Sequence, residues 1–590
     1  MIQPRPNTIG EILTLSKHFV VPPYQRGYAW EIDEAEEFFT DLEMESEFGR
    51  GLFLGTLIFN VAEESQDRIT IVDGQQRLTT IFILLIACRV LAKELKEEGI
   101  AHETQKRITF TNPATAESEG SLLVASGSIR EIFNHMTETE WSGIFPHKVG
   151  PNRVKRQNKR VKPIFEAFRK RIKDYGRPRL SKLLDAIYKT RVIRIDIDGD
   201  EEAFNIFERT NARGMDLEVS DLLKTYLYQQ KVPELDAKWD EILKNADGTI
   251  LKMLKYFYVS RNDYISKSDL YPKLKDYCKK LGGAAKFVEE LCQFSTFYNI
   301  ARKEDNISLI KDYFDAVDCK AISGDPDKYQ RIHISLQALR LFKVSQTYPL
   351  INAAIGSLVR TGGSSNRAAG KVLIKLLDIL EKYHFINSAV CGRVGNEVEK
   401  LYASFCKKFC ESKDFEKTTN ELIGILRGKL APEEEFTSRF CEISYDTDPL
   451  QLIAYIFDRF NNYNLAPGER VAIYDPQTGV KRKNHNVEHF LAKKSDKETK
   501  VDPATQEILD NIGNLLVISF RANSSLGNLP PSKKIQKLKG DLSRRTHNLP
   551  YLKEFVEKYG EKAESWDEHA IEDRARDMAK EAYCQVWKFT

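Results

Sequence analysis

The stretch from residue 69 to residue 91 leaves this chain few ways to fold. Residues 69–72 (Ile-Thr-Ile-Val) predict a strand, and Asp73 and Gly74 predict a tight turn, because glycine accepts backbone angles that other residues avoid. Gln75, Gln76 and Arg77 then open a helix whose next turns are almost wholly apolar. A helix that is apolar all round is buried. The sequence therefore predicts a domain that packs this helix in its core.

The polar residues at the start of the buried helix form the first candidate site. Free N–H groups and the helix dipole favour an anion there. Arg77 could pair with a phosphate, Gln75 and Gln76 could recognise a base or sugar, and Asp73 could hold a metal or a ribose hydroxyl. The alternative is a capped helix with Arg77 in an internal salt bridge, which is the commoner outcome for an isolated strand–turn–helix.

Two further stretches carry similar chemistry. Residues 21–30 (VPPYQRGYAW) follow two prolines with Tyr24, Gln25 and Arg26, and aromatic rings interleaved with Arg and Gln suit stacking on a base. Residues 204–224 predict two helices around a turn that carries Arg209 and Arg213. The alternative for residues 21–30 is a loop whose aromatic side chains pack between domains. The alternative for residues 204–224 is a capped helical hairpin.

These stretches, with FLGTLIF at residues 53–59, resemble the GmrS-type domain of GmrSD-family type IV restriction proteins over about the first 230 residues. The resemblance implies a ParB/sulfiredoxin-like fold that binds and hydrolyses a nucleoside triphosphate through the string DGQQR, here Asp73, Gly74, Gln75, Gln76 and Arg77. Tyr24, Gln25 and Arg26 are predicted as further nucleotide contacts. The sequence has no GxxxxGK[ST] string, which disfavours a Walker-type site.

The mixture of strand-like and helical patterns changes twice along the 590 residues of the chain. Residues 1–230 alternate strand-like runs (51–60, 68–72 and 191–197) with helices. Residues 231–440 carry apolar residues at helical spacing, for example at 307–317, 332–342, 368–384 and 398–409. Residues 441–590 regain strand-like runs and end in polar helices. We therefore expect an α+β multidomain protein with an all-helical middle region.

A second candidate site lies in the C-terminal region. Residues 487–491 and 515–519 predict two strands, followed by a polar loop and a basic helix from residue 532, which is a ββα order. Five polar residues fall within this pattern: Glu488, His489, Asn514, Asn523 and Lys534.

These residue types suit phosphodiester hydrolysis with one metal ion. His489 could act as the general base because its ordinary pKa lies near neutrality. Glu488 and Asn523 offer the hard oxygen ligands that suit Mg²⁺ or another divalent cation. Asn514 could orient the imidazole, and Lys534 could face a phosphate.

The pattern resembles the HNH (His-Me finger) domain of the GmrD type over residues 440–560. The spacing from IGNLLVI to the RAN string also looks like the HNH domain of CRISPR effector nucleases. The resemblance implies that Glu488 and Asn523 bind the metal, His489 is the base and Asn514 positions it. The family string EHILPQ reads EHFLAK here, which weakens the alignment of the turn. His485 competes as the base, and a solvent-exposed His–Glu pair is the alternative for His489 taken alone.

The prediction is an endonuclease that depends on a nucleoside triphosphate and a divalent metal and cleaves modified foreign (phage) DNA in antiviral defence. The alternatives are a nucleotide-gated DNA-binding or regulatory protein without cleavage, and an abortive-infection nuclease that acts on RNA. Scattered cysteines without CxxC spacing favour the cytoplasm. The most apolar run, residues 81–91, contains Arg89 and is shorter than a membrane span, so no membrane partner is expected. A homodimer is one option for its assembly.

Overall fold

A computed structural model gives the fold. It describes residues 4–15, 17–22, 25, 27–49, 51–112, 118–125, 129–145, 152–199, 202–203, 219–266, 269–303, 307–361, 367–393, 396–465, 469–474, 485–493, 502–541 and 549–589. The chain forms two compact units. One contains Met1–Trp239 and Tyr271–Phe287, and the other contains Asp240–Leu270 and Val288–Thr590. The protein is α+β, as the sequence predicts.

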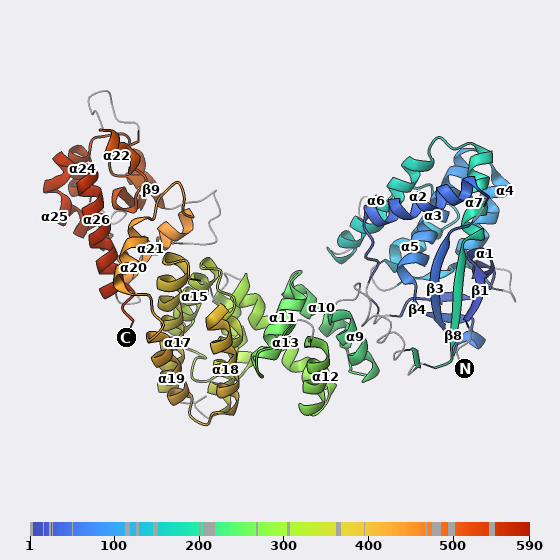
Figure 1. Cartoon of the computed structure of the whole chain (residues 1–590), viewed down its shortest axis with the longest axis horizontal. Coiled ribbons are helices and arrows are strands. Elements are labelled where there is room, and N and C mark those ends of the chain that lie inside the picture. The colour runs from blue at the N-terminus through green and yellow to red at the C-terminus, as the bar shows by residue number, and fades with distance from the viewer. Residues whose placement is uncertain are drawn as a thin grey trace. The chain divides into compact units, whose positions relative to one another are not determined.

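A six-stranded mixed sheet forms the centre of the first unit, with the strand order β1-β8-β3-β4-β2-β7. The β1–β8 and β3–β4 pairs are antiparallel, and the other three pairs are parallel. The three strands predicted at residues 51–60, 68–72 and 191–197 are confirmed as β3, β4 and β8 (Figure 1). The strands are β1 (Pro4–Thr8), β2 (His18–Val20), β3 (Phe53–Asn60), β4 (Arg68–Asp73), β7 (Leu123–Val124) and β8 (Arg191–Ile197), and β5 (Thr109–Thr111) pairs with β6 (Ser118–Ser121) outside this sheet.

Helix α3 (Gln75–Glu94) fills the core of this unit and packs against α4, α6 and α7. By length and composition it could cross a membrane, but 89% of its apolar window is buried inside the protein. That burial is the pattern of a core helix. The other helices are α1 (Ile9–Leu13), α2 (Ile32–Glu47), α4 (Glu98–Ile108), α5 (Arg130–Thr137), α6 (Asn152–Ile172), α7 (Arg177–Lys189), α9 (Val219–Gln229) and α12 (Leu270–Lys280).

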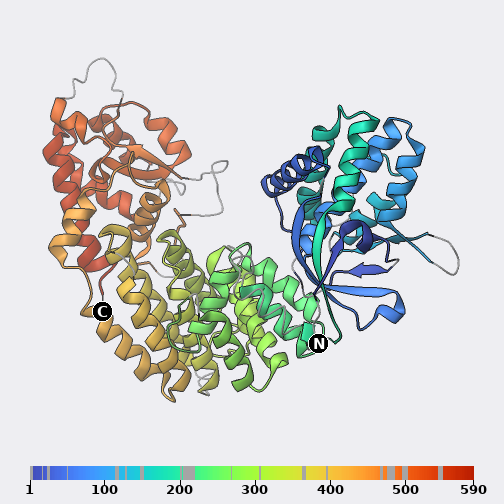
Figure 2. The ribbon, with the colours of Figure 1, turned by 45° about the vertical axis from the view of Figure 1, so that its right-hand side comes forward.

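Helices alone make up the described middle of the chain, as predicted. The segments predicted at 368–384 and 398–409 lie within α17 and α18, and those predicted at 307–317 and 332–342 each end one residue after α14 and α15. Figure 2 shows the helices of this region side by side. Their bounds are α10 (Leu235–Ala246), α11 (Ile250–Val259), α13 (Ala284–Arg302), α14 (Ile307–Ala316), α15 (Pro326–Leu341), α16 (Thr347–Arg360), α17 (Arg367–His384), α18 (Asn396–Glu411), α19 (Phe415–Arg427), α20 (Glu433–Cys441) and α21 (Leu450–Asn462).

The C-terminal part of the second unit builds on an antiparallel pair of strands, β9 (His485–His489) and β10 (Leu515–Ser519). The first strand begins and ends two residues earlier than predicted. The polar loop predicted after the second strand is wrong: residues 520–526 form helix α23 (Phe520–Leu526), because the Ser519 side chain caps it by accepting from the N–H of Ala522 at 3.2 Å. The remaining helices are α22 (Pro503–Glu507), α24 (Pro531–Asp541), α25 (Pro550–Tyr559) and α26 (Glu568–Glu581).

Candidate active site

The β9–β10 pair positions the C-terminal candidate residues. His489 lies opposite Leu515, and Glu488 lies opposite Leu516. Since successive side chains of a strand point to opposite faces, Glu488 and His489 meet different neighbours. Leu515 and Leu516 are fully buried, so β10 is anchored in the core. Its pairing with β9 fixes where Glu488 and His489 lie along the strand.

An acid that the sequence did not indicate holds the imidazole of His489. The Nε2 atom of His489 lies 2.7 Å from Oδ1 of Asp510, and the other carboxylate oxygen of Asp510 lies 2.6 Å from Nζ of Lys493. The ring of Tyr445 packs edge-on against the imidazole at 4.9 Å between centroids. When the neutral imidazole donates Nε2–H to Asp510, Nδ1 keeps its lone pair, and no described residue bonds to Nδ1.

The electrostatics of His489 favour a proton acceptor. Burial lowers the pKa of His489, and the hydrogen bond and negative charge of Asp510 oppose that shift. The net direction is downward, so the neutral form prevails at neutral pH. A neutral imidazole with one nitrogen fixed and the other open is the arrangement that a general base requires.

Glu488 pairs with a buried lysine. Nζ of Lys534, from α24, donates to Oε1 of Glu488 at 2.5 Å and to the carbonyl of His489 at 2.7 Å. The Lys534 side chain is 0% exposed. Burial raises the pKa of Glu488 and lowers that of Lys534, while each partner's charge opposes the shift of the other. Lys534 was predicted to face a phosphate, but the structure turns its ammonium inward, because the Glu488 carboxylate needs a counter-charge once it is desolvated.

Asn514 does not bond directly to the imidazole, contrary to the prediction. Its Nδ2 donates to the carbonyls of Leu491 and Leu509, at 3.0 and 2.8 Å. Its Oδ1 accepts from the N–H of Leu491 and from Nε1 of Trp566, at 2.8 and 3.2 Å. These four bonds use the full capacity of the amide. Because Leu491 follows His489 by two residues and Leu509 precedes Asp510, Asn514 fixes the two segments that carry the His–Asp pair.

The donor set for a metal is small. Among the described residues, no group of three or more His, Cys, Asp and Glu side chains could hold an ion. Asn523 is half-buried on α23, a helix that packs against both β9 and β10. Lys534 contacts Oε1 of Glu488, and no described residue bonds to Oε2. One carboxylate oxygen, one amide oxygen and waters fit the chemistry of Mg²⁺, which usually keeps several waters.

His485, the competing base, lies at the start of β9, four residues from His489 and therefore roughly 13 Å along the strand. Burial lowers its pKa, and the negative charge of Asp458 opposes that shift. No described carboxylate hydrogen-bonds to His485, whereas Asp510 bonds to His489. The geometry therefore favours His489.

At the N-terminal candidate site, Arg77 forms an internal ion pair. Its Nη2 lies 3.0 Å from Oδ2 of Asp73, and its Nη1 donates to the carbonyl of Leu54 at 2.8 Å. Both side chains remain about a quarter exposed, at 25% and 29%. Gly74 has φ +99°, and a Cβ there would lie 2.2 Å from Cδ2 of Leu57, so the turn requires glycine.

Two glutamines fasten the preceding loop to this turn. Nε2 of Gln25 donates to the carbonyls of Ile71 and Val72, at 2.7 and 3.0 Å. Oε1 of Gln76 accepts from the N–H of Ala29 at 2.7 Å, and its Nε2 donates to the carbonyl of Gly27 at 3.3 Å. Gln75 is buried. The predicted contacts Tyr24 and Arg26, and the turn at Arg209 and Arg213, lie outside the described residues.

Sequence reasoning missed Asp510 and Lys493. Asp510 lies between α22 and β10 in an irregular segment, and it is 21 residues from His489 along the chain. The one available signal is an acid four residues before Asn514, shortly before the strand predicted at residues 515–519.

Comparison with protein families finds two matches. Residues 9–228 match the N-terminal domain of GmrSD restriction endonucleases, and residues 431–581 match the C-terminal domain of GmrSD restriction endonucleases. No curated protein matches the chain. The two matches contain the N-terminal turn and the His–Asp pair, respectively.

Proposed function

Since this chain belongs to the GmrSD restriction endonuclease family, we propose that it cleaves DNA at the His489 site, with HNH-type chemistry, under control of a nucleoside triphosphate. A restriction endonuclease acts on DNA, and the C-terminal match contains the described polar cluster around β9. The observation that carries the proposal is the contact between Nε2 of His489 and Asp510, which leaves Nδ1 open.

The residues of the site divide the reaction between them. Nδ1 of His489 takes a proton from a water molecule, whose oxygen bonds to phosphorus as one P–O ester bond of the DNA strand breaks. The leaving alkoxide takes a proton from solvent, and Asp510 stabilises the imidazolium that forms on His489. Glu488 and Asn523 are the residues that would hold a divalent ion, which when bound stabilises the charge that develops on the phosphate. Asn514 keeps the segments that carry His489 and Asp510 in place.

The nucleotide is proposed to bind at the start of α3. The Asp73–Arg77 pair is partly exposed there, at the N-terminal end of α3, where the helix dipole favours an anion. A triphosphate would compete with Asp73 for Arg77, and Asp73 would then be free for a metal or a ribose hydroxyl. In this proposal Gln25 and Gln76 shape the loop, and hydrolysis of the nucleotide controls cleavage of modified phage DNA in the cytoplasm.

The direct test exposes the full chain to unmodified, hydroxymethylated, glucosylated and phosphorothioated DNA and to total RNA, with Mg²⁺ and each nucleoside triphosphate in turn. We expect cleavage of a modified DNA, dependent on one nucleotide and abolished by EDTA. Full cleavage in EDTA would refute the metal, and cleavage of RNA alone would refute the DNA substrate.

The same assay tests the nucleotide site. Asp73→Ala and Arg77→Ala should each lose nucleotide affinity in calorimetry and lose nucleotide-dependent cleavage, while His489→Ala should bind the nucleotide normally. Unchanged affinity in both N-terminal variants would remove the nucleotide from this turn. A homodimer would appear as a doubled mass in light scattering.

A further inference from the structure

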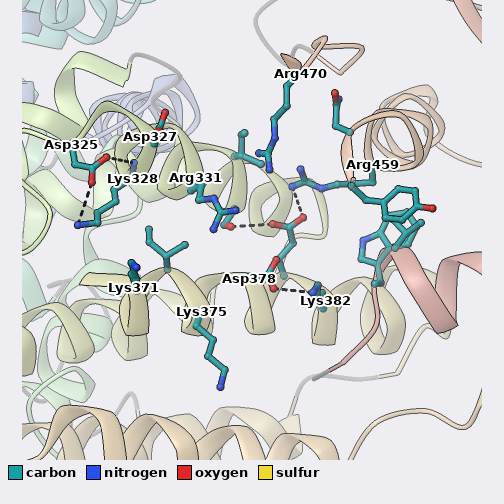
Figure 3. A pocket seen from close by; sticks show the side chains of 18 residues that line it. Asp325, Asp327, Lys328, Arg331, Lys371, Lys375, Asp378, Lys382, Arg459 and Arg470 are labelled. Carbon is teal, nitrogen blue, oxygen red and sulfur yellow. Dashed lines mark hydrogen bonds and ion pairs between the residues drawn. The ribbon is translucent and has the colours of Figure 1, made fainter. Parts of the chain in front are cut away.

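A cavity of about 680 Å³ lies between α15 and α17 in the second unit, with α21 and Trp587 at one end. Its lining on α15 and α17 belongs to residues 325–382, which neither family match covers. Figure 3 shows the side chains of Arg331, Arg459 and Arg470 pointing toward one another over this cavity. These residues come from three separate segments of the chain.

Two acids near this arginine cluster (Arg331, Arg459 and Arg470), Glu381 and Asp458, already accept hydrogen bonds within the protein. Oε1 of Glu381 accepts from Arg459 and from the hydroxyl of Tyr455 at 2.7 Å, and its Oε2 accepts from the hydroxyl of Ser335 at 3.0 Å. The buried carboxylate of Glu381 offsets the charge of Arg459, with which it forms an ion pair. Neither Arg331 nor Arg470 forms an ion pair with any residue that the structure describes.

Asp458, beside Arg459 in α21, accepts hydrogen bonds from the backbone of a neighbouring segment. Its Oδ1 accepts from the N–H groups of Ile473 and Tyr474, at 2.8 and 3.2 Å. Asn462 exchanges two further hydrogen bonds with the backbone of Val471, at 2.8 and 3.0 Å. These bonds from α21 hold residues 471–474 and so place Arg470 over the cavity.

Unused hydrogen-bond donors remain in the cluster. The Nε atoms of Arg459 and Arg470 are buried, and no described residue accepts a hydrogen bond from them. Burial lowers the pKa of Arg470, and the nearby charges of Arg331 and Arg459 lower it further, while the negative charges of Asp458 and Glu381 oppose the shift without reversing it. Guanidinium groups that crowd together without enough carboxylates are electrostatically unfavourable until an anion joins them.

Two further cations line the cavity apart from the arginine cluster. Lys371 and Lys375 line it from α17, and neither pairs with a described acid. The other lysines are paired: Lys382 lies 2.9 Å from Asp378, and Lys328 lies 3.3 Å from Asp325. Asp327 is the one acid of the lining without an ion pair among the described residues, so four unpaired cations face one unpaired acid in a volume typical of a small-molecule site.

We propose that the Arg331–Arg459–Arg470 cluster binds a phosphate group, carried by a nucleotide or by a DNA strand. Planar guanidinium groups bind phosphate oxygens in pairs of parallel hydrogen bonds, and three groups converge here on one volume. This site is separate from the N-terminal turn and from the His489 pair, and it needs neither of their proposed roles. It gives the helical region a binding function in addition to its role as a connector.

The test uses the full chain in EDTA, so that binding is measured without cleavage. The probes are sodium tripolyphosphate, ATP, GTP and a duplex oligonucleotide, and the readouts are calorimetric affinity and hydrogen exchange of α15, α17 and α21. We expect at least one probe to protect these helices. Arg331→Ala/Arg470→Ala should remove that protection and lower the affinity of this site about 10- to 100-fold per guanidinium.

Two controls isolate the site. Lys417→Ala/Arg427→Ala removes the same charge from the exposed face of α19 and should leave protection intact. Arg77→Ala should also leave it intact, which separates this site from the proposed nucleotide site. Protection by the nucleotides and tripolyphosphate identifies a free phosphate ligand, and protection by the duplex alone identifies the DNA backbone. No protection by any probe, or equal protection in the arginine variant, would overturn the proposal.

Discussion

The N-terminal turn and the β9–β10 site contain similar polar residues but use them differently. At the turn, Gln25 hydrogen-bonds to the end of β4, and Gln76 hydrogen-bonds to the loop at residues 27–29. Arg77 hydrogen-bonds to Asp73 and to the carbonyl of Leu54. At the β9–β10 site, Nδ1 of His489 and Oε2 of Glu488 have no described partner. Polar residues in a motif can thus serve the fold in one place and leave reactive atoms open in another.

Burial sharpens this contrast. The Asp73–Arg77 pair is about a quarter exposed, so solvent screens it. The Glu488–Lys534 pair is almost fully enclosed, and burial shifts the pKa of each partner. Groups whose pKa values are perturbed by burial and a specific partner are candidates for chemistry. The turn is therefore suited to exchange partners with a ligand, and the β9–β10 site is preorganised.

The largest expected effect comes from removing the open nitrogen. We expect His489→Ala to lower the cleavage rate about 100- to 10,000-fold, the contribution of a positioned general base, with the fold retained because the side chain is not part of the apolar core. Single-turnover cleavage measures the rate, and circular dichroism checks the fold. The matched variant His485→Ala should cut at nearly the normal rate, and the reverse ranking would transfer the base role to His485.

A smaller effect is expected when the imidazole loses its anionic partner. Asp510→Asn should lower the rate about 10- to 100-fold, the range found for residues that orient metal-bound histidines, because Asp510 acts only through the imidazole. The pH profile separates this role from a purely structural one. Activity requires neutral His489 and falls as the pH drops through its pKa. Since Asp510 raises that pKa, its removal should move the acidic limb to lower pH. An unshifted limb would mean that Asp510 does not act through the imidazole.

The sequence predicted regular elements better than contacts. β-branched runs and helical spacing located β3, β4, β8 and the middle helices, because backbone preference and burial act within each segment. The partners of His489 and Lys534 depend on tertiary packing: Asp510 comes from an irregular segment, and Glu488 meets Lys534 across 46 residues. The arginine cluster joins Arg331 to Arg459 and Arg470, which lie more than a hundred residues further along the chain, and no local pattern in the sequence indicates it.

The smallest effect tests whether the glutamines of the turn are structural. Gln25→Ala leaves the carbonyls of Ile71 and Val72 without their donor inside the protein, so it should cost about 1–3 kcal/mol. Hydrogen exchange of the β4 amides should accelerate by the corresponding factor, about 5- to 150-fold. Gln66→Ala removes an exposed glutamine of the same unit and should change exchange by less than about 0.5 kcal/mol. If Gln25→Ala instead left exchange unchanged and weakened nucleotide binding, its amide would contact the ligand, and the N-terminal turn would be preorganised in the same way as the β9–β10 site.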